Sequence, residues 1–186
     1  DATESLGASY KAKMVGSSGD ISCYSFNGNK LITTGGGGMV VTNNQEMADR
    51  AKYLTTQAKN DDEEYIHDEI GYNYRLTNIQ AAMGVAQMEL IDDFIEKKRA
   101  IAKRYQAELN DYSGIVTMPH EEWANPVYWL YTVLLRPGSG MNIRKSVVRE
   151  MNQNGVGARP FWHTLHDLKP YQDCQDRKST RLNSSH

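Results

Sequence analysis

The apolar residues of this chain follow two different periods. Short runs at 21–26 and 39–42 are rich in β-branched and aromatic side chains, which is typical of strands in a packed sheet. In the runs 46–54, 79–90 and 91–109 the apolar positions instead recur every three to four residues, as on one face of a helix. We therefore expect two neighbouring strands followed by three amphipathic helices.

Two of these helices have recognisable starts. Asn44 precedes an acidic first turn, and Thr77 with Gln80 forms a capping box in which each side chain bonds the backbone of the other residue. On the third helix, Lys97, Lys98, Arg99 and Lys103 form a basic cluster, which we interpret as its solvated side.

A shorter pattern follows the helices. The stretch 111–126 contains a glycine and two prolines, which predicts a connector. A strand at 128–135, a helix capped by Asn142 and a return strand at 156–160 would then form a small α+β domain. The expected division is a large-domain portion at 1–110, a small domain at 111–175 and a tail at 176–186. The tail, DRKSTRLNSSH, is similar to a translated sequencing adapter, and we expect it to be non-native.

Lys30 stands between the two predicted strands. Asn27, Gly28 and Asn29 before it predict a tight turn, so Lys30 would lie at the end of a strand, where α/β proteins place ligands. The four glycines at 35–38 would let backbone approach closely. Such a lysine is either a surface cation, which its spacing alone favours, or a partly desolvated nucleophile for Schiff-base chemistry.

Composition excludes several classes of function. The chain has 186 residues, 39% hydrophobic and 24% charged, as in ordinary globular proteins, and no apolar run is long enough to cross a bilayer. A net charge of −2 gives no basic field for nucleic acid. Cys23 and Cys174, with no disulfide-like spacing, suit a reducing cytoplasm. We expect no metal site, because neither the acidic run 61–64 nor the pair His163 and His166 has matching ligands nearby.

Three ordered motifs carry a resemblance to a known family. They are DATESLG at 1–7 with Lys30 and the glycine run, EIGYNYRLTNIQAA at 69–82, and RPFWH at 159–163. Together they resemble the DegT/DnrJ/EryC1/StrS family of pyridoxal-phosphate (PLP) sugar aminotransferases. The resemblance implies the α/β fold of fold-type I enzymes, with part of a large domain followed by a small α+β domain. Because the first residue already lies in a motif, we expect the chain to be the second half of a longer enzyme.

The resemblance also assigns roles around the cofactor. Lys30 would bind PLP covalently and move protons, Asp1 would hold the pyridine nitrogen, and Ser25 would hold the phosphate. Glu4 stands near the phenolic oxygen, where relatives often carry Gln or His. From the residues alone, Asp1 is more simply a turn or cap residue and Ser25 a strand hydroxyl bonded to backbone.

Further roles would require a second subunit or the substrate. Asn73 matches a residue that reaches the phosphate in the neighbouring subunit, and Arg75 would lie near the same shared site, so the resemblance implies a homodimer. His163 would be a substrate contact at the sugar end. The implied reaction moves an amino group from an amino acid, glutamate in our expectation, to a nucleotide-linked 4-keto-6-deoxy sugar.

The sequence of residues 26–30 and the glycine run resemble those of family members that act on UDP-linked N-acetyl sugars in bacillosamine or legionaminic acid synthesis. Three alternatives remain open: a dehydratase, although those relatives carry histidine in place of Lys30; a noncatalytic regulator on the same fold; and a fragment that is inactive because half of its large domain is missing.

Overall fold

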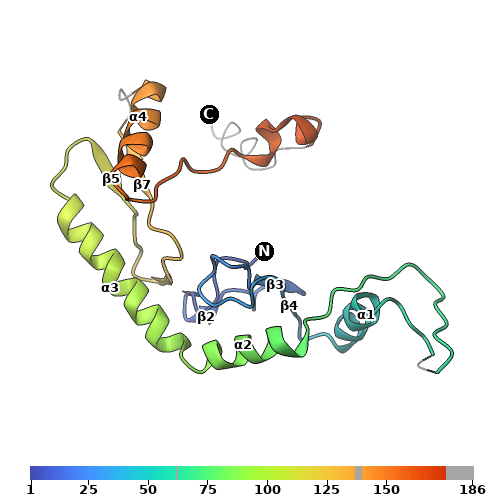
Figure 1. Cartoon of the computed structure of the whole chain (residues 1–186). Helices are drawn as coiled ribbons and strands as arrows, with labels where there is room; N and C mark the ends of the chain where they lie inside the picture. The colour runs from blue at the N-terminus through green and yellow to red at the C-terminus, as the bar shows by residue number, and fades with distance from the viewer. Residues whose placement is uncertain (62, 137–139, 175–186) are drawn as a thin grey trace, which may run out of the picture. The chain divides into compact units, whose positions relative to one another are not determined.

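The chain divides into two compact units. The computed structural model describes residues 1–61, 63–136 and 140–174. One unit is Asp1–Leu134 and the other is Leu135–His186 (Figure 1). These compact units divide the chain at another position than the expected domain boundary at 111, which stays a prediction. The tail 176–186 lies outside the described residues.

A pair of short strands carries the turn that contains Lys30. Strand β3 (Ser22–Ser25) pairs antiparallel with β4 (Gly38–Val41), which confirms both predicted strands, the first shortened and the second shifted by one residue. Ser25 faces Gly38 in this ladder. A Cβ at Gly38 would lie 2.3 Å from the carbonyl oxygen of Tyr24, so only glycine fits where the second strand begins. Hydrogen bonds from Phe26 N to Gly37 O and from Thr34 N to Phe26 O close the loop between the strands.

A second sheet brings two distant segments together. Its strands β2 (Lys13–Met14), β1 (Ser9–Tyr10) and β6 (Ala124–Asn125) are antiparallel neighbours in that order. Lys11 N also donates to Trp123 O at 2.9 Å. The sheet therefore fixes the chain just before residues 126–129 against the N-terminal loop.

The helices begin where their caps predict. Asn44 Oδ1 accepts from Met47 N, and the Thr77–Gln80 capping box is complete. Figure 1 shows the second helix running along the β3–β4 pair. Gln87 on this helix makes two hydrogen bonds with the backbone of Thr33, which lies in the loop between the two strands. The three helices are α1 (Gln45–Thr55), α2 (Asn78–Met88) and α3 (Ile91–Leu109). Among the described residues, no helix combines the length and apolar character needed to cross a membrane.

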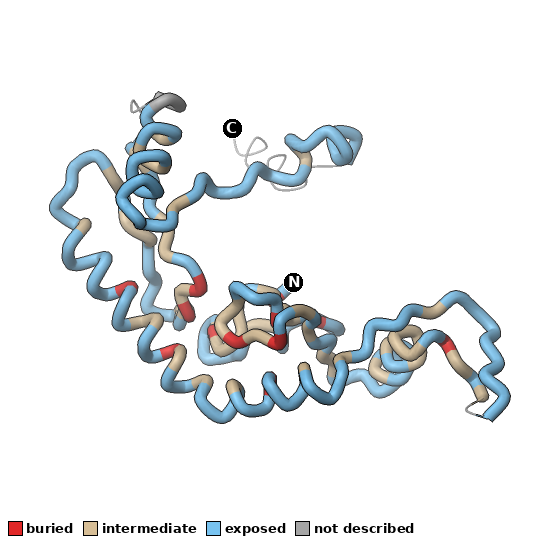
Figure 2. Tube along the Cα trace, viewed as in Figure 1, coloured by how far each residue is buried: buried red, intermediate tan, exposed pale blue. Residues whose placement is uncertain are grey.

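The core of the first unit lies where the N-terminal loop meets α3. Ala8, Ile95 and Val127 form its buried cluster, and partly buried Leu31, the residue after Lys30, packs against it. Figure 2 marks buried positions in red on α3 and around the strand pair. The turn with Lys30 is therefore attached directly to the packed core.

The predicted strand at 128–135 is wrong over most of its length. Only β7 (Val133–Leu135) forms, paired with β5 (Ile115–Thr117). Tyr128 has a φ of +49°, which an extended strand cannot contain, and the chain there turns inward to bury Val127 and Trp129.

Two predictions in the second unit are also wrong. The helix there, α4 (Gly140–Gln153), begins before Asn142, so Asn142 lies inside it and is not its cap. Residues 156–160 form no strand, because the Asn152 side chain takes up both backbone polar groups of Ala158 that a neighbouring strand would bond. Short 3₁₀ turns at η1 (Leu165–Asp167) and η2 (Lys169–Tyr171) follow.

The segment after α1 folds back onto the end of that helix. Tyr72 N donates to Leu54 O, and Gln57 N donates to Tyr72 O. A Cβ at Gly71 would lie 2.2 Å from the carbonyl carbon of Gln57 and 2.3 Å from Ala58 N. Because both neighbours are backbone, a side chain there cannot be accommodated by a rotamer change.

We expect Gly71→Ala to lower the free energy of unfolding by about 1–3 kcal/mol, as overpacking against rigid neighbours does. Gly114→Ala is the matched control, because a Cβ at Gly114 meets nothing within 4 Å. Urea denaturation of both variants, made in the complete reading frame, measures the difference. Equal stabilities would contradict the close approach at Gly71.

Candidate active site

Lys30 is not a freely solvated surface lysine. It closes the turn after β3 through a hydrogen bond from Lys30 N to Asn27 O, and only 12% of its side-chain surface is exposed. Since spacing alone favours a surface cation, this burial is the first structural support for a chemical role. A partly desolvated amine is more reactive as a nucleophile than a hydrated one.

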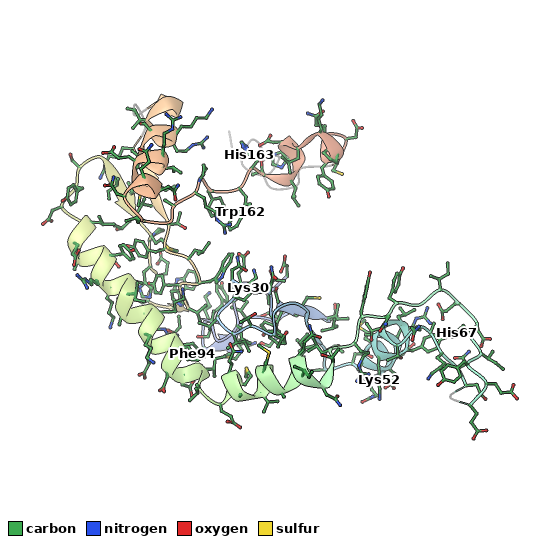
Figure 3. The ribbon with its side chains drawn as sticks, viewed as in Figure 1. Lys30, Lys52, His67, Phe94, Trp162 and His163 are labelled. Atoms are coloured by element: carbon green, nitrogen blue, oxygen red, sulfur yellow. The ribbon has the colours of Figure 1, made fainter. Side chains whose placement is uncertain are left out.

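Several functional groups converge on this amine. Glu4 Oε1 lies 3.5 Å from Lys30 Nζ, and the Trp129 ring centroid lies 4.0 Å from the same nitrogen. Thr3, Glu4, Ser25, Lys30 and Trp129 line one narrow pocket, and Figure 3 labels Lys30 beside the strand pair. The structure thus brings three predicted site residues, Glu4, Ser25 and Lys30, into one pocket.

The N-terminal segment is held against β3, but Asp1 is not among the residues that line the Lys30 pocket. Ala2 is 2% exposed, and its N–H donates to Cys23 O. Asp1 is exposed and its carboxylate accepts from Thr3 N at 3.0 Å, as expected of a turn residue. Ser25 Oγ accepts from Asn27 N at 3.3 Å and so supports the turn before Lys30. Both local roles leave carboxylate and hydroxyl lone pairs for a ligand.

Trp129 is a site residue that the sequence analysis missed. Its Nε1–H donates to Asn29 O at 2.6 Å, across a separation of 100 residues. Lys98 Nζ donates to Trp129 O, and Arg99 Nε donates to Pro126 O. The interpretation of Lys98 and Arg99 as solvated is therefore wrong: α3 uses them to hold the segment that carries Trp129. Only an aromatic run marks Trp129 in the sequence, and no local pattern reveals so distant a partner.

Asn73 and Arg75 are exposed and do not line the Lys30 pocket. Asn73 pairs in a β-bridge with Thr56. The residues before and after it, Tyr72 and Tyr74, stack their rings on each other with centroids 5.1 Å apart. The side chains of Asn73 and Arg75 are therefore open to contact from outside this chain.

An ion pair between Arg50 on α1 and Glu69 anchors the start of the segment that contains Asn73 and Arg75. The hydrogen bonds from Arg50 lower the pKa of Glu69 below its ordinary value, and those with Glu69 raise the pKa of Arg50. The pair thus favours the charged form of both side chains.

His163 belongs to the second unit and is exposed. Its neighbour Trp162 packs edge-on against Phe161 at 5.3 Å and lies under the Arg159 guanidinium at 4.5 Å; Figure 3 labels both Trp162 and His163. Across the described part of the chain, no three His, Cys, Asp or Glu side chains are grouped to hold a metal ion.

A larger hollow of about 410 Å³ lies between the strand pair and α2. Its lining is almost entirely apolar, with Phe26, Met39, Leu76, Val85 and Met88 among its residues. Because the groups that can carry chemistry converge at Lys30, the smaller pocket is the candidate active site.

The family comparison matches the whole chain. The model of the DegT/DnrJ/EryC1/StrS aminotransferase family covers residues 1–186, and thus also includes the expected tail, whose origin stays a prediction. A GDP-perosamine synthase of Caulobacter vibrioides is 39% identical over 92% of this chain and 46% of its own length. A Campylobacter jejuni UDP-4-amino-4,6-dideoxy-N-acetyl-beta-L-altrosamine transaminase is 36% identical over 92% of this chain and 46% of its own length.

Solved structures agree with these relatives. The Helicobacter pylori PseC aminotransferase, involved in the biosynthesis of pseudoaminic acid, matches with a TM-score of 0.86 and 27% identity over 94% of this chain and 47% of that one. This likeness confirms the predicted fold-type I architecture for the part present. The chain spans about half the length of the relatives that it matches.

The lowered pKa of Glu69 predicts a pH-dependent contribution to stability. A carboxyl with a depressed folded-state pKa stabilises the fold above its unfolded pKa, and this stabilisation is lost as the pH falls through the folded value. Glu69→Gln should therefore be less stable than the parent at neutral pH. The two should converge as the pH falls below the folded-state pKa of Glu69, where this carboxyl is protonated in both the folded and the unfolded state. Urea denaturation of both proteins from neutral to acidic pH measures the difference in stability. A difference that persists in acid would contradict the ion pair as its cause.

Proposed function

Because the chain belongs to the DegT/DnrJ/EryC1/StrS aminotransferase family, we propose that it is part of a PLP-dependent enzyme. The enzyme transfers an amino group from an amino acid to the keto carbon of a nucleotide-linked 4-keto-6-deoxy sugar. One observation carries this proposal: the Lys30 amine is mostly buried in a pocket that it shares with Glu4 and Ser25.

The residues present fit PLP by their chemistry. Lys30 offers an amine for the aldehyde, Ser25 a hydroxyl for the phosphate, and Asp1 a carboxylate for the protonated pyridine nitrogen. Lys30 and Ser25 line one pocket, and the Asp1 segment is hydrogen-bonded to the neighbouring strand β3 through Ala2 N and Cys23 O. When bound, PLP supplies the electron sink that makes the α-carbon of an amino acid acidic.

The chain's own side chains then handle protons. Lys30 Nζ accepts the proton that leaves the donor's α-carbon, and Asp1 keeps the pyridine nitrogen protonated. Glu4 lies close enough to Lys30 Nζ to stabilise its ammonium form between proton transfers. Ser25, which lines the same pocket as Lys30, would hold the phosphate of the cofactor.

A homodimer completes the site in this proposal. Asn73 and Arg75 are exposed and lie outside the Lys30 pocket of their own chain, which supports a role for them in the neighbouring subunit's site. His163, exposed on the second unit, contacts the sugar. The enzyme acts in the cytoplasm, where nucleotide sugars and PLP are available.

The nucleotide divides the substrate proposal into two candidates. The sequence of residues 26–30 and the glycine run support a UDP-linked N-acetyl sugar, as in bacillosamine or legionaminic acid synthesis, with glutamate as donor. The 39% identity to a GDP-perosamine synthase favours a GDP-linked sugar as the second candidate. Both pathways make amino sugars for surface glycans.

Replacing Lys30 tests the chemistry directly. In the protein made from its complete reading frame, borohydride should fix PLP to Lys30, and glutamate should bleach the visible band of the lysine-bound cofactor. Lys30→Ala should lose the band and at least about 10³-fold in transamination, because the covalent attachment and the proton carrier are both removed. Lys52→Ala, on exposed α1, is the matched control and should retain both.

The same assay separates the alternatives. A parent protein that binds no PLP at Lys30 would sink the proposal and leave a regulator as the better account. Bound PLP that glutamate does not bleach would overturn glutamate as the donor, whereas Lys30 itself argues against the dehydratase, whose members carry histidine there. A bleached cofactor followed by amination of one of two keto sugars, UDP-linked or GDP-linked, identifies the nucleotide. The 186-residue chain alone, assayed beside the full protein, shows whether truncation abolishes activity.

Mixing two inactive variants tests the shared site. Lys30→Ala and Asn73→Ala subunits, refolded together in equal amounts, should recover about a quarter of the parent activity, since half of the dimers are mixed and each mixed dimer has one intact site. Each variant refolded alone is the control. No recovery from the mixture would place Asn73 in the site of its own chain.

A further inference from the structure

Trp129 makes two different contacts with one turn. Its ring centroid lies 4.0 Å from Lys30 Nζ, and its indole N–H donates to Asn29 O, the carbonyl just before Lys30. The first contact involves the end of the lysine side chain, and the second involves the backbone carbonyl of the preceding residue, Asn29. Together they fix both ends of the side chain that the proposed function requires.

Trp129 is itself held firmly. It is 9% exposed, and Val127, two residues before it, belongs to the buried core cluster. Lys98 and Arg99 on α3 donate to the carbonyls of Trp129 and Pro126 at 2.8 and 3.1 Å. The indole ring therefore acts as part of the rigid core, whereas an exposed aromatic side chain would change rotamer freely.

We propose that Trp129 is a positioning residue for Lys30: its ring face holds the amine charge in the pocket, and its N–H holds the turn on which the lysine stands. This inference rests on the proposed function and extends it to a residue about 100 positions away.

The chemistry of the two neighbours of Nζ explains why a ring is useful. Glu4 Oε1 lies 3.5 Å away on a side chain that is 48% exposed, so it can move and can also accept a proton. An indole face attracts an ammonium group through its quadrupole but cannot take its proton. Trp129 therefore holds the ammonium form of the amine without competing for its proton, as repeated proton transfer requires.

Three variants in the complete reading frame test this role. Trp129→Leu removes the ring and the N–H, whereas Trp129→Phe keeps a smaller ring face and loses the N–H. Trp123→Leu is the matched control, because Trp123 is 47% exposed and packs edge-on against Tyr10.

The first measurement needs no cofactor. Reductive methylation of the apoprotein, followed by peptide mass spectrometry, compares the labelling of Lys30 with that of exposed Lys52. Trp129→Leu should raise the relative labelling of Lys30 at least about threefold, because the ring that covers the amine is gone. Trp129→Phe should lie between this variant and the parent, and Trp123→Leu should match the parent.

The second measurement uses the protein loaded with PLP. In Trp129→Leu the pH midpoint of the visible band should move to lower pH, because the ring no longer stabilises positive charge on Nζ. The Phe variant should restore most of this shift. kcat should fall about tenfold in Trp129→Leu while KM for the amino donor changes less than about twofold, as for lost positioning of a reacting group.

The outcomes separate this inference from the proposed function. A parent that binds PLP at Lys30, with Trp129→Leu equal to Trp123→Leu in labelling, midpoint and kcat, overturns the role of Trp129 and leaves the function intact. A parent that binds no PLP overturns the function, and the labelling comparison then decides the contact alone: unchanged Lys30 labelling in both Trp129 variants overturns it.

Discussion

The position of Lys30 depends on a hydrogen bond between residues that are 100 positions apart in the sequence. The indole N–H of Trp129 donates to Asn29 O, and this bond joins the turn after β3 to the segment that follows β6. Without it, the turn would be held by β3 and by the packing of Leu31 against the core cluster. The strand pair alone could not fix it, because isolated two-stranded hairpins are marginally stable in water.

Burial and charge cooperate at this junction. The core cluster of Ala8, Ile95 and Val127 excludes water behind the turn, with Leu31 packed against it. Three cationic side chains at its border have partners: Lys98 and Arg99 donate to backbone carbonyls, and Lys30 contacts both a carboxylate and a ring. A cation can thus be kept beside an apolar core because its charge is stabilised without full hydration.

Local chemistry was predictable from the sequence and long-range contacts were not. The caps at Asn44 and Thr77 and the two strands around Lys30 were predicted, since each depends on a few adjacent residues. The strand expected at 128–135 failed because Tyr128 adopts a left-handed conformation that no composition rule marks.

The candidate site was predictable to the same extent. Glu4, Ser25 and Lys30 were found through motifs and do line one pocket, whereas Trp129 required the tertiary structure. The prediction that Lys98 and Arg99 are solvated failed for a related reason. Long cationic side chains can reach backbone carbonyls on a neighbouring segment, and the helical periodicity of α3 gives no information about which segment lies beside it.

Helix α3 therefore tolerates substitutions on its surface better than changes in its length. One residue inserted or deleted between Ile95 and Lys98 would rotate the two basic side chains by about 100° and shift them by about 1.5 Å along the axis. Both carbonyl contacts would then be lost at once, although Ile95 could remain in the core. Among related chains, the spacing between the buried isoleucine and the Lys–Arg pair should accordingly vary less than the identity of the residues between them.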